Sequence, residues 1–378
     1  MKIDRLLSHY REVWTVDTEY CFADRNSGNR PTPLCLVAHE MRSNRWLRLW
    51  QHQLRRERPP FRVDNEGLFV AYYSPAEWGF FLALDWPLPE MVLDLHTEFR
   101  CLNNGLPTIA GYSLPGALIH FGIPGIDAEE KEEMRELILT GGPWSLAEQR
   151  KILKYCESGV AALDRLLPAM MPRIDLQRAV YRGRYQRAVA VMEHNGAPVN
   201  QELLGRLLEN WDRIRHRIIE KADAGYGIFD GRTFKYDRFE LWLARNGIPW
   251  PRLESGRLDL SDDTFRQLAR AFPQVSLLRE LRHTLSELRL NDLTVGADGR
   301  NRAMLSSFGA RTSRNTPSNS RFIFGPSVWI RNLIQPPLGH AVASIDWSQQ
   351  EFGIAGVLSG DKRMLAAYLS GDPYLAFA

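Results

Sequence analysis

Short apolar and β-branched runs, bounded by polar or turn-forming residues, recur through the first 172 residues. Such runs are typical of strands, whereas residues 74–86 and 145–170 have the apolar spacing of helices. The longer helix opens with the capping-box pair Ser145 and Glu148, and the shorter one with Ser74 as a candidate N-cap. Strands that alternate with helices predict an α/β fold with sites at the carboxyl ends of strands. The predicted strands are residues 13–21, 33–41, 43–50, 67–73 and 91–99.

Helical periodicity dominates the middle of the chain, and an irregular part follows it. From Gly296 to Pro337 the sequence is rich in Ser, Asn, Arg and Pro, and strand character returns in "HAVASIDW", residues 340–347. These changes predict three regions: an α/β domain over 1–172, a mainly helical region over 173–295, and a third region over 296–378. The predicted helices of the middle region are residues 178–196, 201–223 and 276–290.

The composition is that of a folded protein, with 44% hydrophobic and 25% charged residues. No apolar stretch approaches the roughly 20 residues of a membrane-spanning helix, and the N-terminus resembles no secretory signal. We therefore expect a cytoplasmic protein without a membrane partner.

The four cysteines are widely spaced and form no CxxC pair, which predicts buried free thiols rather than a zinc site or disulfides.

Two acids stand near the end of the first predicted strand. Asp17 and Glu19 are separated by one residue, so both side chains point to the same face of a strand. Neighbouring carboxylates repel each other, and a divalent cation is the usual reason to keep them together. A solvated acid pair is the alternative, because a D-x-E string alone occurs in many proteins.

The stretch "WTVDTEYC" resembles the first motif of the DEDD family of 3′–5′ exonucleases, whose ribonuclease H-like sheet carries an Asp and a Glu on its first strand. The family's second motif places an acid after a later strand. Glu77 in "LFVAYYSPAEWG" stands there, with Tyr73 where Asn is common. The third motif of the tyrosine branch is Y-x3-D, and Tyr155 in "KYCESGVAAL" matches its tyrosine. The resemblance implies a site for two Mg²⁺ or Mn²⁺ ions at Asp17, Glu19 and Glu77, with Tyr155 as a catalytic residue.

The chain departs from this motif at Gly159, where the family has an aspartate beside the tyrosine hydroxyl. Glu157 and Asp164 lie at other angles around the helix and cannot take its place. A glycine within a helix costs about 1 kcal/mol relative to alanine, and this one brings no evident structural gain. We therefore predict impaired hydrolysis, through natural loss or deliberate substitution. Compensation by water or another acid is the alternative. Asp94 is interpreted as a structural acid at a strand end.

Arginines gather without acidic residues between Gly299 and Arg331, interleaved with hydroxyl, amide and aromatic side chains. Arginine and hydroxyl groups bind phosphate oxygens, and aromatic rings offer surfaces on which bases stack. We predict a nucleic-acid contact surface, with a solvated irregular loop as the alternative. The candidate DNA-binding residues are Arg300, Arg302, Arg311, Ser313, Arg314, Asn319 and Arg321.

From residue 188 onward the order of motifs resembles a family A DNA polymerase, the class that includes bacterial DNA polymerase I. "AVAVMEHNGAPVN" resembles the M-E-x-x-G-[IV] helix that opens the polymerase region. "IDWSQQEFGIAGVLSGD" resembles palm motif A, D-Y-S-Q-I-E-L-R-x-x-A-x-x-S-G-D. The resemblance implies that Asp346 binds both catalytic Mg²⁺ ions and that Glu351 screens against a ribose 2′-hydroxyl, while Gly353 replaces the motif's arginine. A strand-end acid that caps the next helix is the alternative for Asp346.

The two resemblances together imply an exonuclease domain, a thumb-like helical region and the first part of an α+β palm. In the full-length family this arrangement supports DNA synthesis with proofreading on primer–template DNA and single-stranded 3′ ends. The 378 residues contain neither the fingers string R-x3-K-x6-Y-G nor the H-D-E motif, so deoxynucleoside triphosphates would bind only if those parts were supplied. We predict DNA binding without polymerisation. The alternatives are an active metal-dependent exonuclease, and a non-enzymatic DNA-binding subunit completed by a second polypeptide.

Overall fold

The computed structural model describes residues 7–21, 28–54, 58–104, 106–125, 128–287, 293–325 and 328–376. The chain forms two compact units, Met1–Ile334 and Gln335–Ala378. Within the described ranges no helix combines the length and the apolar character that crossing a membrane requires.

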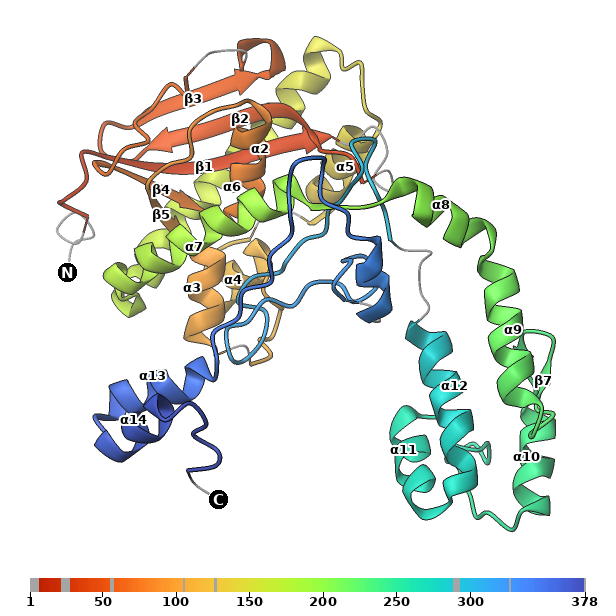
Figure 1. The fold of residues 1–378 in the computed structure, drawn as a ribbon. Helices are drawn as coiled ribbons and strands as arrows, with labels where there is room; N and C mark the ends of the chain where they lie inside the picture. The colour runs from red at the N-terminus through yellow and green to blue at the C-terminus, as the bar shows by residue number, and fades with distance from the viewer. Residues whose placement is uncertain are drawn as a thin grey trace. The chain divides into compact units, whose positions relative to one another are not determined.

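A five-stranded mixed sheet forms the first part of the larger unit (Figure 1). Its strand order is β3-β2-β1-β4-β5, in which β1 pairs antiparallel with β2 and parallel with β4. The predicted strands are confirmed to within two residues at each end, except that the last one stops at Asp94, where a helix begins. The strands are β1 (Glu12–Cys21), β2 (Thr32–Glu40), β3 (Arg45–Trp50), β4 (Gly67–Ala71) and β5 (Met91–Asp94).

Two long helices pack on this sheet. α6 lies against β1 and β2, and α7 lies against β5 and α2 (Figure 1). Apolar side chains from the strands and helices form buried clusters between these layers, which fixes β1 at the centre of the domain. The helical segments of this part are η1 (Gln51–Gln53), α2 (Pro75–Ala83), α3 (Leu95–Leu102), α4 (Leu114–His120), α5 (Ala128–Leu139), α6 (Leu146–Met170), η2 (Met171–Arg173) and α7 (Leu176–Asn195).

The helix caps confirm one prediction and correct another. Ser145 and Glu148 form the predicted capping box of α6. Ser74 precedes α2 as predicted, but its hydroxyl does not cap the helix, because its backbone is already helical (φ −51°, ψ −21°) whereas a capping residue has an extended backbone. The hydroxyl instead donates to Asp94 Oδ2 at 2.8 Å. Asp94 also accepts a hydrogen bond from the Thr97 N–H at 2.9 Å and caps α3. Its interpretation as a structural acid is therefore confirmed.

All four cysteines are free thiols, as predicted. Cys35 and Cys156 are buried together in the apolar cluster between β2 and α6. Cys21 and Cys101 are only partly buried, so the expectation of complete burial holds for two of the four.

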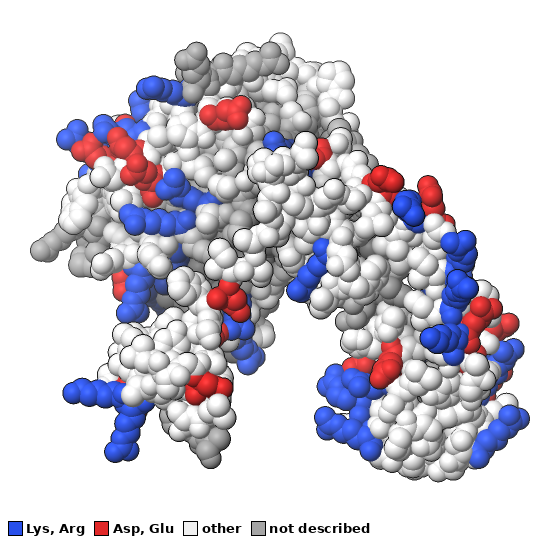
Figure 2. All heavy atoms as spheres, viewed as in Figure 1, with Lys and Arg blue, Asp and Glu red and all other residues white. Residues whose placement is uncertain are grey.

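A helical region follows α7 in the same unit, and its core combines aliphatic side chains with aromatic ones, among them Phe239 stacked on Phe265. The helix predicted over 201–223 divides into α8 and α9, and the one predicted over 276–290 is described as far as Glu287. Basic and acidic side chains are mixed on the visible surface of this region (Figure 2). The remaining elements are β6 (Ala197–Pro198), α8 (Gln201–Glu209), α9 (Trp211–Asp223), β7 (Phe229–Asp230), β8 (Thr233–Phe234), α10 (Tyr236–Arg245), α11 (Asp262–Ala271), η3 (Pro273–Val275), α12 (Ser276–Glu287), β9 (Arg300–Asn301), η4 (Val328–Leu333), α13 (Gln350–Ser359) and α14 (Lys362–Leu369).

The smaller unit, Gln335–Ala378, contains α13 and α14 packed against each other. Gly353 permits this close packing, because a Cβ atom there would lie 2.8 Å from the ring of Tyr368. The strand predicted over 340–347 is not formed. A strand needs a neighbour to satisfy its backbone N–H and C=O groups, and no segment in the described part of the chain pairs with these residues.

Candidate functional site

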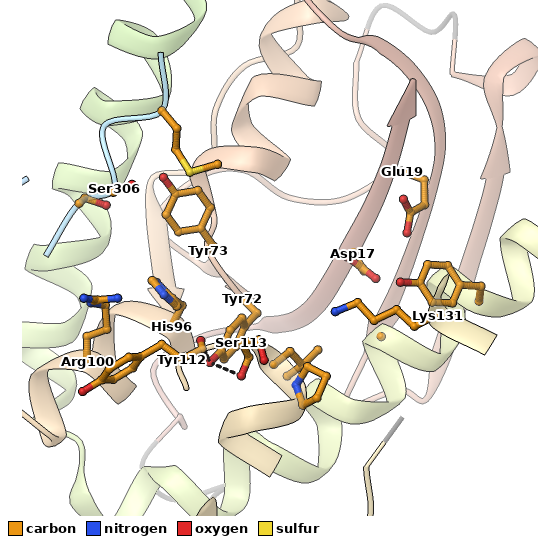
Figure 3. Close-up of a pocket in the computed structure, with 16 residues that line it drawn as sticks. Asp17, Glu19, Tyr72, Tyr73, His96, Arg100, Tyr112, Ser113, Lys131 and Ser306 are labelled. Carbon is orange, nitrogen blue, oxygen red and sulfur yellow. Dashed lines mark hydrogen bonds between the residues drawn. The ribbon is translucent and has the colours of Figure 1, made fainter. Parts of the chain in front are cut away.

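Residues of β1, α5 and α6, with others that follow β4, surround a cavity of about 730 Å³, which we call the acid cavity (Figure 3). Asp17 and Glu19 line it from β1, and Tyr155 and Gly159 line it from α6. Both acids face the cavity because alternate residues of a strand point to the same side. Three residues of the exonuclease-like motifs, and the glycine that departs from them, therefore meet in one hollow.

Burial raises the pKa of both cavity acids above their ordinary values. For Glu19 the negative charge of Asp17 raises the pKa further. The ammonium group of Lys131, which Figure 3 shows directed toward Asp17, lowers the pKa of both acids and so partly offsets the effect of burial. The two acids thus share a nearby cation that the chain itself supplies.

Glu77 is buried near the start of α2 and is not among the residues that line the acid cavity. Its Oε2 atom has no hydrogen-bond partner among the described residues. Loss of hydration raises the pKa of Glu77 well above its usual range, and the negative charge of Asp17 raises it further. The acid of the second motif therefore lies within electrostatic reach of the pair but does not face the cavity with it.

Gly159 stands directly against Asp17. A Cβ atom at position 159 would lie 2.1 Å from Asp17 Oδ2 and 3.0 Å from Asp17 Cγ. This contact corrects the expectation that the glycine brings no structural gain. Without a side chain at this position, α6 comes close enough to β1 for the Asp17 carboxylate to fill the vacant space.

Two further acids of α6 bind elsewhere, as their positions on the helix predict. Glu157 accepts two hydrogen bonds from Arg48, at 2.6 and 2.7 Å. Asp164 accepts a hydrogen bond from Thr15 Oγ1 at 2.7 Å and lies 2.7 Å from His39 Nδ1. Neither acid lines the acid cavity, so neither supplies a carboxylate where the exonuclease motif has its aspartate.

The acid cavity does not fit a complete two-metal centre. Such a centre needs ligands that clamp a pair of ions roughly 3.5–4 Å apart. Within the part of the chain that the structure describes, no three His, Cys, Asp or Glu side chains are arranged to hold even one metal ion. Residue 159 supplies no side-chain oxygen, and Lys131 already brings positive charge to Asp17 and Glu19.

The acid cavity also contains residues that the sequence patterns did not mark, among them Tyr72, His96, Arg100 and Tyr112. The Tyr72 hydroxyl donates to the Tyr112 carbonyl at 2.7 Å, and the Arg100 guanidinium lies over the Tyr112 ring, 4.4 Å from its centroid. Tyr72 directly follows β4, and its position at the carboxyl end of a strand could have marked it as a candidate site residue. Lys131 lies in a run of charged residues on α5, which gives no such signal.

Residues 304–316, which we call the 304–316 segment, contribute Met304, Ser306 and Ser307 to the lining of the acid cavity. Two hydrogen bonds, one buried and one partly buried, join this segment to α7. The Leu305 N–H donates to Glu193 Oε1 at 2.6 Å, and the Ser307 hydroxyl donates to a side-chain oxygen of α7 at 2.6 Å. The segment is therefore fixed to the helix that packs on the sheet.

Replacing Glu193 by glutamine is expected to flatten the pH dependence of stability. Burial raises the pKa of Glu193 from 4.5 to about 7. Because the folded chain binds this proton more tightly, the stabilisation is complete below pH 4.5 and is lost as the pH rises to about 7. The wild type is therefore expected to lose about 2–3 kcal/mol of unfolding free energy between pH 5 and pH 8 through this group, and Glu193→Gln should not show this loss in urea titrations.

Glu157→Gln is the control for this comparison, because the Arg48 contact lowers the pKa of Glu157 and leaves that carboxylate charged across the range. We expect its slope between pH 5 and pH 8 to match that of the wild type. Equal slopes for the wild type and Glu193→Gln would show that Glu193 does not gain a proton on folding.

Two of the seven predicted DNA-binding residues use their guanidinium groups within the protein. Arg300 donates to the Gly196 carbonyl at 3.0 Å. Arg302 pairs with Asp298 and donates to the His194 carbonyl at 2.8 Å. These contacts attach the beginning of the arginine-rich stretch to the end of α7. The other five candidates are exposed: Arg311, Ser313, Arg314, Asn319 and Arg321.

In the smaller unit, Asp346 is exposed in the irregular stretch before α13, and Glu351 is exposed in the first turn of that helix. Gln349 between them has a left-handed backbone with a φ of 46°. Gly353, at the position of the motif's arginine, is buried. Both carboxylates are open to solvent, and their roles in metal binding and nucleotide selection remain predictions.

No family model matches the sequence, and no curated protein matches it. Among solved structures, the chain is similar to the POL domain of Pol1 from M. smegmatis in complex with DNA primer-template and dNTP. The TM-score is 0.61 and the sequence identity 15%. The match covers 97% of this chain and 63% of that one, so the chain spans less than two thirds of the polymerase domain's length. At this identity the likeness shows the fold, and it confirms the polymerase-like architecture that the motifs imply.

Proposed function

We propose that this chain is a DNA-binding protein related to family A DNA polymerases, with an exonuclease-like cavity that hydrolyses DNA slowly or not at all. The likeness of its fold to a polymerase domain bound to primer–template supports the first part. The sheet order, with the acid pair on the central strand β1, supports a ribonuclease H-like exonuclease ancestry for the first domain.

One observation carries the second part of the proposal: a Cβ atom added at position 159 would lie 2.1 Å from Asp17 Oδ2, so Gly159 stands directly against this carboxylate. In two-metal sites the bound ions supply an activated water and stabilise the leaving oxygen. Here the position that faces Asp17 has no side chain. The positive charge of Lys131 also partly neutralises Asp17, as a bound metal ion would. Asp17 and Glu19 then act as a partly neutralised acid pair that can contact a strand without cleaving it.

DNA binding is proposed to rest on the exposed arginines of the 304–316 segment and on Arg321, in a stretch that contains no acidic residue. Arginine forks bind phosphate oxygens in two-bond contacts. Asp346 would contribute one carboxylate to a polymerase metal pair, which also requires a carboxylate from a second palm element. We therefore propose binding of primer–template DNA, with extension dependent on a second palm element and a fingers segment.

Incubation of the purified chain with a 5′-labelled single-stranded oligonucleotide and Mg²⁺ or Mn²⁺ tests the cavity. We expect no shortened products above the background of an Asp17→Ala variant, because the metal ligands are incomplete. A ladder of shortened products that Asp17→Ala abolishes would show an active exonuclease.

A parallel anisotropy titration with labelled primer–template tests the DNA-binding part of the proposal and should show salt-sensitive binding.

A further inference from the structure

A second hollow, of about 470 Å³, lies on the side of α7 that faces away from the sheet. We call it the α7 groove. Its walls come from α7 and from the 304–316 segment, which are far apart in the sequence. None of its lining residues is acidic: they are Tyr181, Arg182, Arg184, Tyr185, Phe308 and Ser313.

Two tyrosines of the groove are exposed to an extent that is unusual for large aromatic side chains, 75% for Tyr181 and 39% for Tyr185. The Tyr185 hydroxyl donates to Asn315 Oδ1 at 3.0 Å, and its ring meets the ring of Phe308 edge to face, with centroids 5.7 Å apart. Tyr185 and the half-buried Phe308 are therefore held in place, and the ring of Tyr181 is the most accessible of the three. Fixed and accessible rings are the surfaces on which unpaired bases stack.

Two exposed arginines stand on the same two segments as these rings. Arg184 is exposed on α7, and Arg311 is exposed on the 304–316 segment. Arg182, by contrast, forms two hydrogen bonds with Glu98, at 2.7 and 2.5 Å, so it shapes the wall and is not available to a phosphate. Exposed arginines beside accessible rings are complementary to a strand with charged phosphates and unstacked bases.

The 304–316 segment is held in an unfavourable backbone conformation at two residues of the groove, Phe308 and Ser313, and at the nearby Ser306. Ser306, Phe308 and Ser313 have φ values of 47°, 55° and 62°, a region that residues with side chains seldom adopt. Arg100 fixes this shape by donating to the carbonyls of Phe308 and Gly309, at 2.9 and 2.7 Å. Such conformations persist where surrounding contacts impose them, and they gather at ligand-binding sites.

We infer that the α7 groove binds single-stranded nucleic acid, with unpaired bases stacked on Tyr181 and Phe308 and phosphates beside Arg184 and Arg311. This inference rests on the proposed DNA-binding function and adds a subsite to it. A duplex does not fit this role, because its bases already stack on one another and offer no free faces. The residues just before Phe308 line the acid cavity, so a strand in the groove lies next to that cavity.

Anisotropy titrations with labelled (dT)8 and with a labelled blunt duplex test the inference. Tyr181→Ala is expected to weaken (dT)8 binding about tenfold and to leave duplex binding unchanged, because only the single strand loses a stacking partner. Tyr181→Phe keeps the ring and should keep the affinity. Arg184→Gln should weaken (dT)8 binding and reduce its salt dependence. Thermal melting checks that each variant is folded. We expect the Tyr181 variants to fold, because this side chain is exposed and contributes little to the core.

The outcomes separate this inference from the function on which it rests. If Tyr181→Ala bound (dT)8 as tightly as the wild type does, and still bound the duplex, the inference about the α7 groove would be wrong. The proposed DNA-binding function would remain in place. If Tyr181→Ala lost the same affinity for (dT)8 and for the duplex, the inference would also be wrong, because the ring would not distinguish unpaired bases from paired ones. If the wild type bound neither DNA, the proposed function itself would fail.

Discussion

Replacing Gly159 by aspartate is expected to convert the acid cavity into a working 3′–5′ exonuclease, with a rate on the order of 100-fold above that of the wild type. Position 159 points at Asp17, so an aspartate there adds a carboxylate where the acid pair lacks one. The obstructing atom is Asp17 Oδ2, the end of a side chain, and a rotamer change can move it. The measurement is the rate of shortening of a 5′-labelled single strand in Mg²⁺ or Mn²⁺.

Gly159→Asn is the matched control, because it adds a side chain of the same size without the negative charge. We expect Gly159→Asn to stay at the wild-type rate. Adding Lys131→Met to Gly159→Asp should raise the rate further, since the lysine charge disfavours a metal ion beside Asp17. Equal rates for the aspartate and asparagine variants would mean that the missing carboxylate does not limit hydrolysis.

Replacing Gly183 by alanine is expected to lower the free energy of unfolding by about 3 kcal/mol. A Cβ atom at position 183 would lie 2.0 Å from the Val92 carbonyl oxygen and 2.8 Å from its carbonyl carbon. Both atoms belong to the backbone of β5, so no side-chain rotation relieves the clash and α7 must move away from the sheet. Urea denaturation followed by tryptophan fluorescence measures the loss.

Gly205→Ala on α8 is the control for this prediction, because a Cβ atom there would meet nothing within 4 Å. Alanine is the better helix former, so this variant should be as stable as the wild type or more stable, by up to about 1 kcal/mol. A loss of less than about 1 kcal/mol in Gly183→Ala would contradict the direct packing of α7 on β5.

Much of the first domain could be predicted because its strands and helices leave strong local patterns. The strand predicted over 13–21 and the capping box at Ser145 depend on residues that are neighbours in sequence, and both are present. The strand predicted over 340–347 depends on a pairing partner instead of on local propensity, and it is not formed. The Ser74 hydroxyl binds Asp94 at the end of the next strand, a contact that no local pattern reveals.

The chemistry of the candidate site was predictable only in part, for a similar reason. The spacing of Asp17 and Glu19 places both on one strand face, and the helical position of Gly159 identifies the missing acid. The close contact between Gly159 and Asp17 depends on how near α6 comes to β1, which periodicity does not specify. Lys131 reaches the pair from a third element, so its role emerges only in three dimensions.

The Mn²⁺ content of the acid cavity tests the central claim most directly, because it depends on the ligands and not on turnover. Mn²⁺ titrations followed by electron paramagnetic resonance should compare the wild type with Asp17→Ala. They should also compare Gly159→Asp with the variant that carries both Gly159→Asp and Asp17→Ala. We expect Asp17→Ala to leave the wild-type isotherm unchanged and to remove a bound ion from Gly159→Asp. If Asp17→Ala removed a bound ion from the wild type, the cavity would already hold the metal, and the claim of an incomplete site would be wrong.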